Sequence, residues 1–175
     1  MVMKQIIFLL FVTFICACQK PSEPMVPEYD GKITAQKNGE TWTAEAYAVQ
    51  KNSMSSSMAI FFRKNNEKTG IEDKCVISNI PFSQGIYEVG PNLNNDNTDT
   101  SIYGKFYFKD YDIVIGSYNI LGGNPNSLTL ESYDAVSKEF RGSLDLIFIV
   151  DQKSEATLPD TIRISKGVFH GKLIN

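Results

Sequence analysis

The sequence predicts an all-β domain, an antiparallel β-sandwich or flattened barrel of about ten strands. Apolar and polar residues alternate with a period of two in most segments after residue 30, as half-buried strands require. Turn residues interrupt these segments about every dozen residues, the spacing of an all-β fold. No stretch after residue 17 keeps a helical period for three turns. We therefore expect no helix longer than a short turn.

The first expected pair of strands surrounds Asn38-Gly39, the strongest short hairpin signal because both turn residues tolerate positive φ. The first strand should cover 31–37. In the second strand one face is apolar, which predicts that it is buried. That face consists of Trp42, Ala44, Ala46 and Ala48. We expect Trp42 to be a core anchor; the alternative is a Trp that stacks on a ligand.

The later segments repeat this pattern. Strands are expected at 58–63, 74–80, 85–90, 101–110, 128–133, 140–151, 161–165 and 168–174, with a nearly all-apolar stretch at 111–118 that continues from the strand before it. Pro81 should end its strand because it has no N–H to donate. The far end of 140–151 is apolar on both faces, which predicts a central strand covered on each side there, or one that reaches an interface.

One outer face carries an unusual composition. In segment 101–110, Tyr103, Lys105, Tyr107 and Lys109 alternate with the residues expected inside. Two tyrosines interleaved with two lysines could stack on a sugar ring or meet an acidic partner. We expect instead an ordinary amphipathic face, on which Tyr and Lys cover the sheet and keep their tips in water, and the binding face is the alternative.

The most polar segment, 92–101, is a second candidate binding element. Its side-chain oxygens include those of Asn94, Asp96 and Asp99, and such oxygens can coordinate calcium. The spacing differs from an EF-hand loop: counted from Asn94, the sixth position holds Asp99 instead of Gly and the twelfth holds Lys105 instead of an acid. We expect a solvated loop and no metal ion, with function carried by this loop or by the rim around it.

The sequence lacks the residue patterns of several common catalytic and metal-binding sites. His170 is the only histidine, so a histidine metal cluster is impossible, and we expect an outer-face or hydrogen-bonded sheet histidine. Cys75 should be a small buried hydrophobe. No G-x-S-x-G motif, P-loop or dinucleotide fingerprint is present. We therefore expect no cofactor and no enzyme; the alternative is a hydrolase that uses paired carboxylates on a polysaccharide.

The first residues have the layout of a secretory signal. Lys4 precedes an apolar run at 6–15, which is shorter than the roughly 20 residues of a transmembrane helix. The run ends in Ile15-Cys16-Ala17 and resembles a lipobox, the bacterial lipoprotein signal. We therefore expect residues 1–17 to be removed and Cys18 to be lipidated.

A tether should follow the lipidated cysteine. Segment 18–29 contains Pro21, Pro24 and Pro27 among polar residues, and polyproline II at roughly 3.1 Å per residue would hold the domain about 30 Å from the membrane. A disordered N-terminal segment would have the same composition. Residues 30–175 are enough for one domain with a core. The domains are thus expected to be 1–17, 18–29 and 30–175.

Charge and cysteine content exclude two classes. Once Lys4 is removed, 16 Lys and Arg side chains stand against 20 Asp and Glu, a mild net charge of −4 without a basic block. Nucleic-acid binding is therefore not expected, because phosphate recognition needs clustered Lys and Arg. After processing and lipidation only Cys75 remains, so no disulfide framework is expected.

Three short stretches resemble an uncharacterised family of Bacteroidota lipoproteins. They are Ile33-Thr34-Ala35 through Asn38-Gly39 to Trp42, Phe140-Arg141-Gly142-Ser143-Leu144, and Ile164-Ser165-Lys166-Gly167-Val168-Phe169. The chain departs from the family pattern at Leu144, where Phe is usual, and at Ser165, where Thr is usual. The resemblance covers most of 30–173 and implies an all-β lipoprotein of the outer membrane. It implies no catalytic residues.

These observations predict a membrane-anchored envelope lipoprotein that acts as a binding or interaction module. The membrane contact would be the lipid at Cys18. The expected partner is a glycan or an envelope protein, bound through the face of Tyr103 and Tyr107 or through the polar segment beside it.

Overall fold

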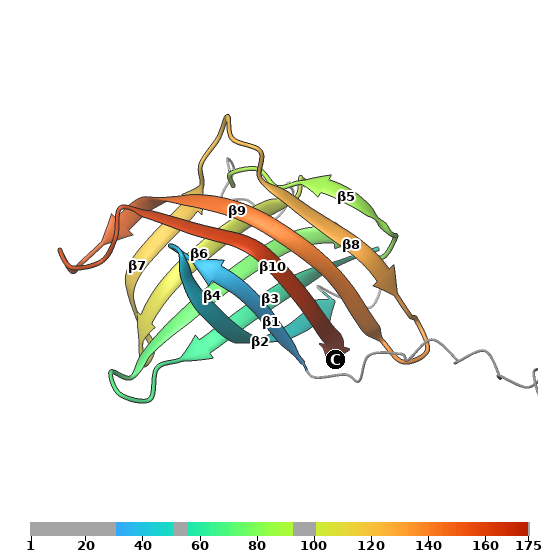
Figure 1. The fold of residues 1–175 in the computed structure, drawn as a ribbon, viewed down its shortest axis with the longest axis horizontal. Helices are drawn as coiled ribbons and strands as arrows, with labels where there is room; N and C mark the ends of the chain where they lie inside the picture. Colours follow the sequence, from blue (N-terminus) through green and yellow to red (C-terminus); the bar gives the residue numbers. More distant parts are fainter. Residues whose placement is uncertain (1–30, 51–55, 93–100, 175) are drawn as a thin grey trace, which may run out of the picture.

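The structure is a computed structural model that describes residues 31–50, 56–92 and 101–174 (Figure 1). These residues form ten β-strands and, within the described ranges, no helix. The strands are β1 (Lys32–Lys37), β2 (Glu40–Gln50), β3 (Ser57–Asn65), β4 (Ile71–Pro81), β5 (Gly85–Glu88), β6 (Tyr103–Asp110), β7 (Ile113–Ile120), β8 (Ser127–Tyr133), β9 (Glu139–Lys153) and β10 (Thr161–Ile174). The all-β prediction is confirmed.

The strands form a single mixed sheet that closes in a ring but is not a regular barrel. Its wall runs β2, β3, β4, β6, β7, β9 and β10, and β1 closes it by pairing with both β10 and β2. All of these pairs are antiparallel except β10 with β2, where Lys172–Ile174 runs parallel to Tyr47–Val49. The result fits the expected β-sandwich or flattened barrel.

Strand β9 joins the two parts of the wall. One edge pairs with β10 along most of its length. The other edge pairs first with β8, from Phe140 to Asp145, and then with β7, from Phe148 to Lys153. Strand β5 extends β8, and Gly90 just after it forms a parallel bridge with Tyr103 of β6. The chain at 90–92 therefore runs beside the start of β6.

The hairpin at Asn38-Gly39 forms as predicted, with φ of 52° and 88° at the two residues. The stretch 111–118 is different from the prediction. It does not continue the strand before it, because the chain reverses at Tyr111-Asp112 and β7 pairs antiparallel with β6. Tyr111 has φ of 50°, a conformation that composition alone does not reveal for a tyrosine. In contrast, the two segments expected at 161–165 and 168–174 form one strand with a bulge between Ile164 and Gly167.

The inward face of the ring is the core. Trp42 and the alanines that alternate with it are buried, as the period-two pattern predicted. Aromatic residues are the largest of the buried side chains, and fully burying each contributes about 1.5–3 kcal/mol. They are Phe62, Phe106, Phe108, Tyr118, Phe140, Phe148 and Phe169. The outward residues of the same strands are therefore free to form a surface of a different composition.

The end of β9 is covered on one side only. Strand β9 is central in the sheet because both of its edges are paired. Its outward Ile149 is 43% exposed, and no described residue covers that face as a second layer. The expectation of cover on both sides is thus wrong for the described residues, since a single closed sheet has one buried face. The other expectation, that this end reaches an interface, stays a prediction.

Candidate functional site

The outward face of β6 brings the four predicted residues into one site. Tyr103, Lys105, Tyr107 and Lys109 line a hollow of about 360 Å³. Neighbouring strands and the chain after β5 complete its lining, which also includes Lys74, Val76, Ser78, Asn92 and Val114. The predicted side chains are half-buried instead of fully solvated. The hollow, which we call the β6 face, is the candidate site.

Strand register explains why β4 contributes to the β6 face. In this antiparallel pair Lys74 lies opposite Tyr107, and Ser78 lies opposite Tyr103. Directly opposite side chains on one face of a sheet have Cβ atoms about 4.5–5.5 Å apart. Lys74 is therefore held next to Tyr107 by the backbone ladder.

Positive charge gathers on this face. Burial lowers the pKa of Lys74, and the positive charges of Lys109 and Arg63 lower it further, while Glu72 acts in the opposite direction. Glu72 itself binds Arg63 through two hydrogen bonds of 3.0 and 3.2 Å. Among the described residues, no carboxylate forms an ion pair with Lys105 or Lys109.

Aromatic rings extend the face across β3 and β2. Phe61 and Tyr47 are stacked, with ring centroids 5.1 Å apart and planes within 6° of parallel. The Lys74 ammonium lies over the Phe61 ring, 5.3 Å from its centroid. Burial raises the pKa of Tyr107, with smaller contributions from Tyr103 and Asp151. Flat apolar surface and cationic groups are thus continuous over several strands.

Two amide oxygens beside the β6 face lack hydrogen-bond partners among the described residues. Asn92 Oδ1 and Asn119 Oδ1 are both buried and unpartnered. Asn92 lines the hollow, and Asn119 lies opposite Lys105 in the β6–β7 register. Buried acceptors without a partner are uncommon and call for an explanation.

The remaining predicted residues have separate outcomes. Asn94, Asp96 and Asp99 lie outside the described residues, as does Cys18, so neither the calcium alternative nor lipidation is tested. Trp42 is a core residue, 2% exposed.

His170 and Cys75 have the structural roles that the sequence predicted. His170 is buried and its Nε2 lies 3.2 Å from Glu139 Oε2. Cys75 is buried with a free thiol, and burial raises its pKa well above the usual range. A thiol held in its protonated form is a poor nucleophile.

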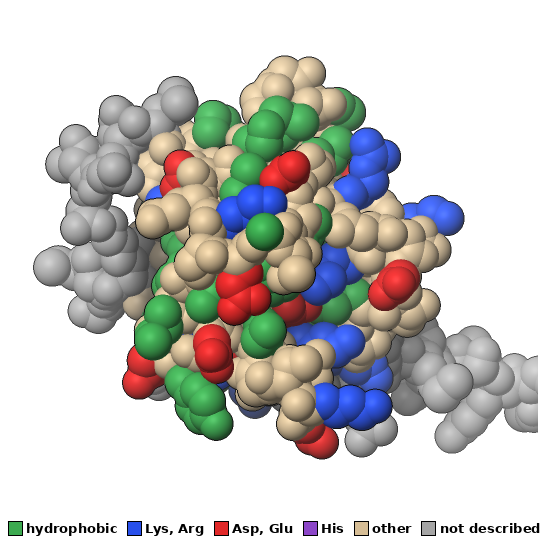
Figure 2. Space-filling model, turned by 90° about the vertical axis from the view of Figure 1, so that its left-hand side faces the viewer, with side chains coloured by type: hydrophobic (Ala, Val, Ile, Leu, Met, Phe, Trp, Pro, Cys, Tyr) green, Lys and Arg blue, Asp and Glu red, His purple; other side chains and the backbone are tan. Residues whose placement is uncertain are grey.

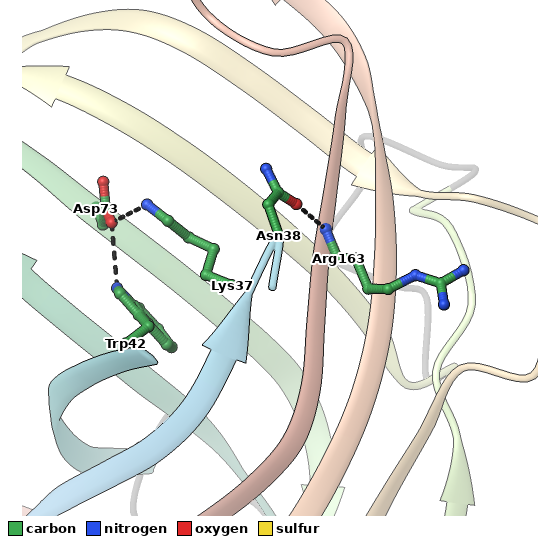
Figure 3. Close-up of polar contacts among 5 residues, drawn as sticks. All are labelled: Lys37, Asn38, Trp42, Asp73 and Arg163. Atoms are coloured by element: carbon green, nitrogen blue, oxygen red, sulfur yellow. Dashed lines mark hydrogen bonds and ion pairs between the residues drawn. The ribbon is translucent and has the colours of Figure 1, made fainter. Parts of the chain in front are cut away.

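A polar cluster that no sequence pattern indicated lies at one end of the ring. Lys37 at the end of β1 forms an ion pair with Asp73 of β4, and Trp42 Nε1 donates to the same carboxylate oxygen at 3.1 Å (Figure 3). The Lys37 ammonium also lies 5.2 Å from the centroid of the Phe108 ring. Three strands supply these groups, so only their pairing order could have revealed the cluster.

This cluster forms one wall of a second hollow, of about 310 Å³, at the end of the ring. Figure 2 looks onto that end and shows acidic and basic side chains intermixed with apolar ones. The turns after β3 and β9 border it through Asn66, Thr69 and Leu158. Because the charges of Lys37 and Asp73 neutralise each other, the arrangement favours closure of the core over ligand binding.

Further observations concern metals and membranes. In the described ranges, no group of three or more His, Cys, Asp or Glu side chains is placed to hold a metal ion. The same ranges contain no helix long and apolar enough to cross a membrane. A comparison of the chain with protein-family models, curated proteins and solved structures finds no match.

Proposed function

We propose that the protein is an envelope lipoprotein that binds a glycan through the β6 face. The observation that carries the proposal is the alignment of Tyr103 and Tyr107 with Lys105 and Lys109 along one hollow. Aromatic faces pack on the apolar face of a sugar ring, and ammonium groups donate hydrogen bonds to its oxygens. Asn92, whose buried Oδ1 has no hydrogen-bond partner among the described residues, lines the same hollow.

The spacing of the two tyrosines supports a chain of sugars over a single ring. They are four residues apart on β6, or about 13 Å at 3.3 Å per residue. Lys105 lies between them on the same side of the strand. A ligand that contacts both rings must therefore extend along the strand. A concave hollow with a few polar groups among apolar ones is the general form of such sites.

Membrane anchoring is the second part of the proposal. The signal-like run before Cys18, the lipobox resemblance and the proline-containing segment 18–29 together support a lipid anchor and a spacer. The resemblance to Bacteroidota lipoproteins supports the outer membrane as the location. In such a position the domain would meet glycans of the cell envelope or its surroundings.

Replacement of both tyrosines tests the binding site. The Tyr103→Ser/Tyr107→Ser variant should keep the wild-type circular dichroism spectrum and lose at least tenfold in glycan affinity, about 1.4 kcal/mol. Glycans are first selected on an array with the full chain in detergent, and affinities are then measured by calorimetry. Tyr111→Ser is the matched control, because Tyr111 is 84% exposed in the β6–β7 turn and does not line the hollow.

Three results would overturn the proposal. Unchanged affinity in the double tyrosine variant would remove the β6 face as the site. Capture of an envelope protein with no glycan bound would favour a protein partner. Turnover of a polysaccharide by the purified protein would support the alternative of a carboxylate-based hydrolase.

Replacement of the lipidated cysteine tests the anchor. The Cys18→Ala variant should accumulate as an unprocessed precursor and should not incorporate a fatty-acid probe. A Cys16→Ala variant is the control, because Cys16 would leave with the signal peptide and its loss should not prevent labelling. Normal labelling of Cys18→Ala would contradict anchoring at that residue.

A further inference from the structure

The β6 face holds three lysines around one hollow. Lys74 comes from β4, and Lys105 and Lys109 come from β6. In the described part of the chain, neither Lys105 nor Lys109 takes part in an ion pair, and the ammonium of Lys74 rests over an aromatic ring. Three positive charges therefore share a half-buried surface. Among the described residues, no carboxylate forms an ion pair with any of the three.

The nearest acidic groups have other partners. Glu72 accepts two hydrogen bonds from Arg63, with the closer contact at 3.0 Å. Asp151, which lies near Tyr107, accepts a hydrogen bond of 3.2 Å from Ser117 Oγ. Neither residue lines the hollow. Glu72 lies opposite Lys109 in the β4–β6 register, so it offsets part of the positive charge. The three lysines that line the hollow still leave it with a net positive charge.

The lysines also repel one another. Burial lowers the pKa of Lys74 most; Glu72 counteracts this, and the charges of Lys109 and Arg63 lower the pKa by smaller amounts. Repulsion between like charges in a partly desolvated site is relieved when an anion binds among them. The same lysines would gain nothing comparable from a neutral sugar.

From this arrangement we infer that the glycan carries carboxylates, as a uronic acid does, and that Lys74, Lys105 and Lys109 bind them. This inference rests on the proposed function, because it identifies the chemical class of ligand at the same site. The two tyrosines of the hollow favour a sugar over an acidic peptide. A sugar offers an apolar ring face and hydroxyl donors in the same unit.

Esterification provides a matched pair of probes. Polygalacturonate, alginate and hyaluronate are each tested by calorimetry against the full chain in detergent, with their carboxyl groups either free or methyl-esterified. At least one of the three polysaccharides should bind at least tenfold more tightly with free carboxyl groups than as its methyl ester. Its affinity should fall as salt rises from 0.05 to about 0.5 M, because screening weakens exposed charge pairs.

Lysine variants locate the effect. Lys105→Met/Lys109→Met keeps much of the apolar stems and removes two charges, so uronate affinity should fall at least tenfold. Lys166→Met is the control, because Lys166 is an exposed residue of β10 that does not line the hollow. Its uronate affinity should equal that of the wild type. Circular dichroism spectra of all three proteins should coincide.

The outcomes separate the two proposals. Equal affinity for free and esterified forms, or binding of neutral glycans only, would overturn the uronate inference and leave glycan binding intact. An acidic peptide such as polyglutamate that binds as tightly as the best uronate would overturn the choice of a sugar. Failure of every glycan, charged or neutral, would overturn the proposed function itself.

Discussion

Asn38 and Arg163 lie 125 residues apart in sequence and exchange two hydrogen bonds of 2.8 Å each. The Asn38 backbone N–H donates to the Arg163 carbonyl. The Asn38 side-chain oxygen accepts from the Arg163 N–H (Figure 3). The turn residue thus continues the β1–β10 ladder beyond the end of β1. One asparagine both makes the hairpin and joins it to the last strand.

Substitutions at Asn38 should separate these two roles. Asn38→Gly keeps the positive φ and loses the side-chain bond, a loss of about 1 kcal/mol in the free energy of unfolding. Asn38→Ala loses the bond and also strains the backbone, for a total of about 2–3 kcal/mol. Asn38→Asp retains an acceptor and should stay within about 0.5 kcal/mol of the wild type. Urea unfolding measures all three, and equal losses in the Gly and Ala variants would contradict the division.

Gly39 should resist substitution for conformational reasons alone. Its φ is 88°, and a Cβ added there would meet no heavy atom within 4 Å. Gly39→Val should therefore destabilise the fold by about 1–3 kcal/mol through backbone strain. Gly122→Val is the matched control, because a Cβ at Gly122 also meets nothing within 4 Å and its backbone is not left-handed. Equal melting temperatures for Gly39→Val and Gly122→Val would contradict backbone strain at position 39.

Alanine substitutions at two core glycines should differ in whether a second substitution can restore stability. A Cβ at Gly171 would lie 2.3 Å from Phe140 Cζ, and a Cβ at Gly142 would lie 2.0 Å from the Thr129 carbonyl oxygen and 2.6 Å from Phe169 Cζ. Either Gly→Ala change should destabilise the protein by about 3 kcal/mol or more through overpacking.

The rescue depends on what each Cβ would strike. Phe140→Leu should reduce the effect of Gly171→Ala, because the obstructing atoms belong to that side chain. Phe169→Leu should leave Gly142→Ala destabilising, because the Thr129 carbonyl remains. Double-mutant cycles of unfolding free energy give the two coupling energies. Similar coupling in both pairs would contradict the geometry.

Tryptophan fluorescence should detect the hydrogen bond between Trp42 and Asp73. Trp42 is the only tryptophan, and its Nε1 donates to Asp73 Oδ2 at 3.1 Å. Asp73→Ala should shift the emission spectrum and lower the unfolding free energy by about 1–3 kcal/mol, because Lys37 and Trp42 lose an acceptor. Asp160→Ala is the control: Asp160 pairs with Lys153 but its side chain is 76% exposed, so about 0–1 kcal/mol is expected. An unshifted spectrum in Asp73→Ala would contradict the contact.

Stability should fall at alkaline pH. Burial raises the pKa of Cys75 well above its usual value, and burial also raises the pKa values of Tyr107 and Tyr118. For such groups the unfolded state releases protons first, so stability is complete below the unfolded pKa and is lost as pH rises above it. The decline should begin near the ordinary thiol pKa of about 8.5 and steepen above about 10, where tyrosines ionise.

A cysteine variant isolates the first part of this decline. Cys75→Ala should flatten the curve of unfolding free energy between about pH 8.5 and 10, while the tyrosine-dependent fall above pH 10 persists. The measurement is urea unfolding at a series of pH values with reductant present. The slope of unfolding free energy against pH is compared, and not the unfolding free energy itself, because loss of the thiol also leaves a small cavity that lowers stability at every pH. A parallel curve in the variant would contradict the thiol effect.

Local pattern was sufficient for the strands and their faces. The alternation around Trp42 and along 101–110 identified inward and outward residues correctly, because side-chain period in a strand depends only on the chain itself. The Asn38-Gly39 turn was equally local. At Tyr111 the local signal was misleading, because a tyrosine at φ of 50° is uncommon and the turn there is enforced by the β6–β7 pairing.

By itself, the sequence determined an all-β chain and a face on which Tyr and Lys alternate. Only the tertiary structure decided that the sheet closes in a ring, that Lys74 lies opposite Tyr107, and that Lys37, Trp42 and Asp73 meet. The physical reason is that the periodicity of a strand is a local property, whereas its neighbours and register depend on contacts between distant segments. The lysines of the β6 face come from two strands, and strand register brings their charges together.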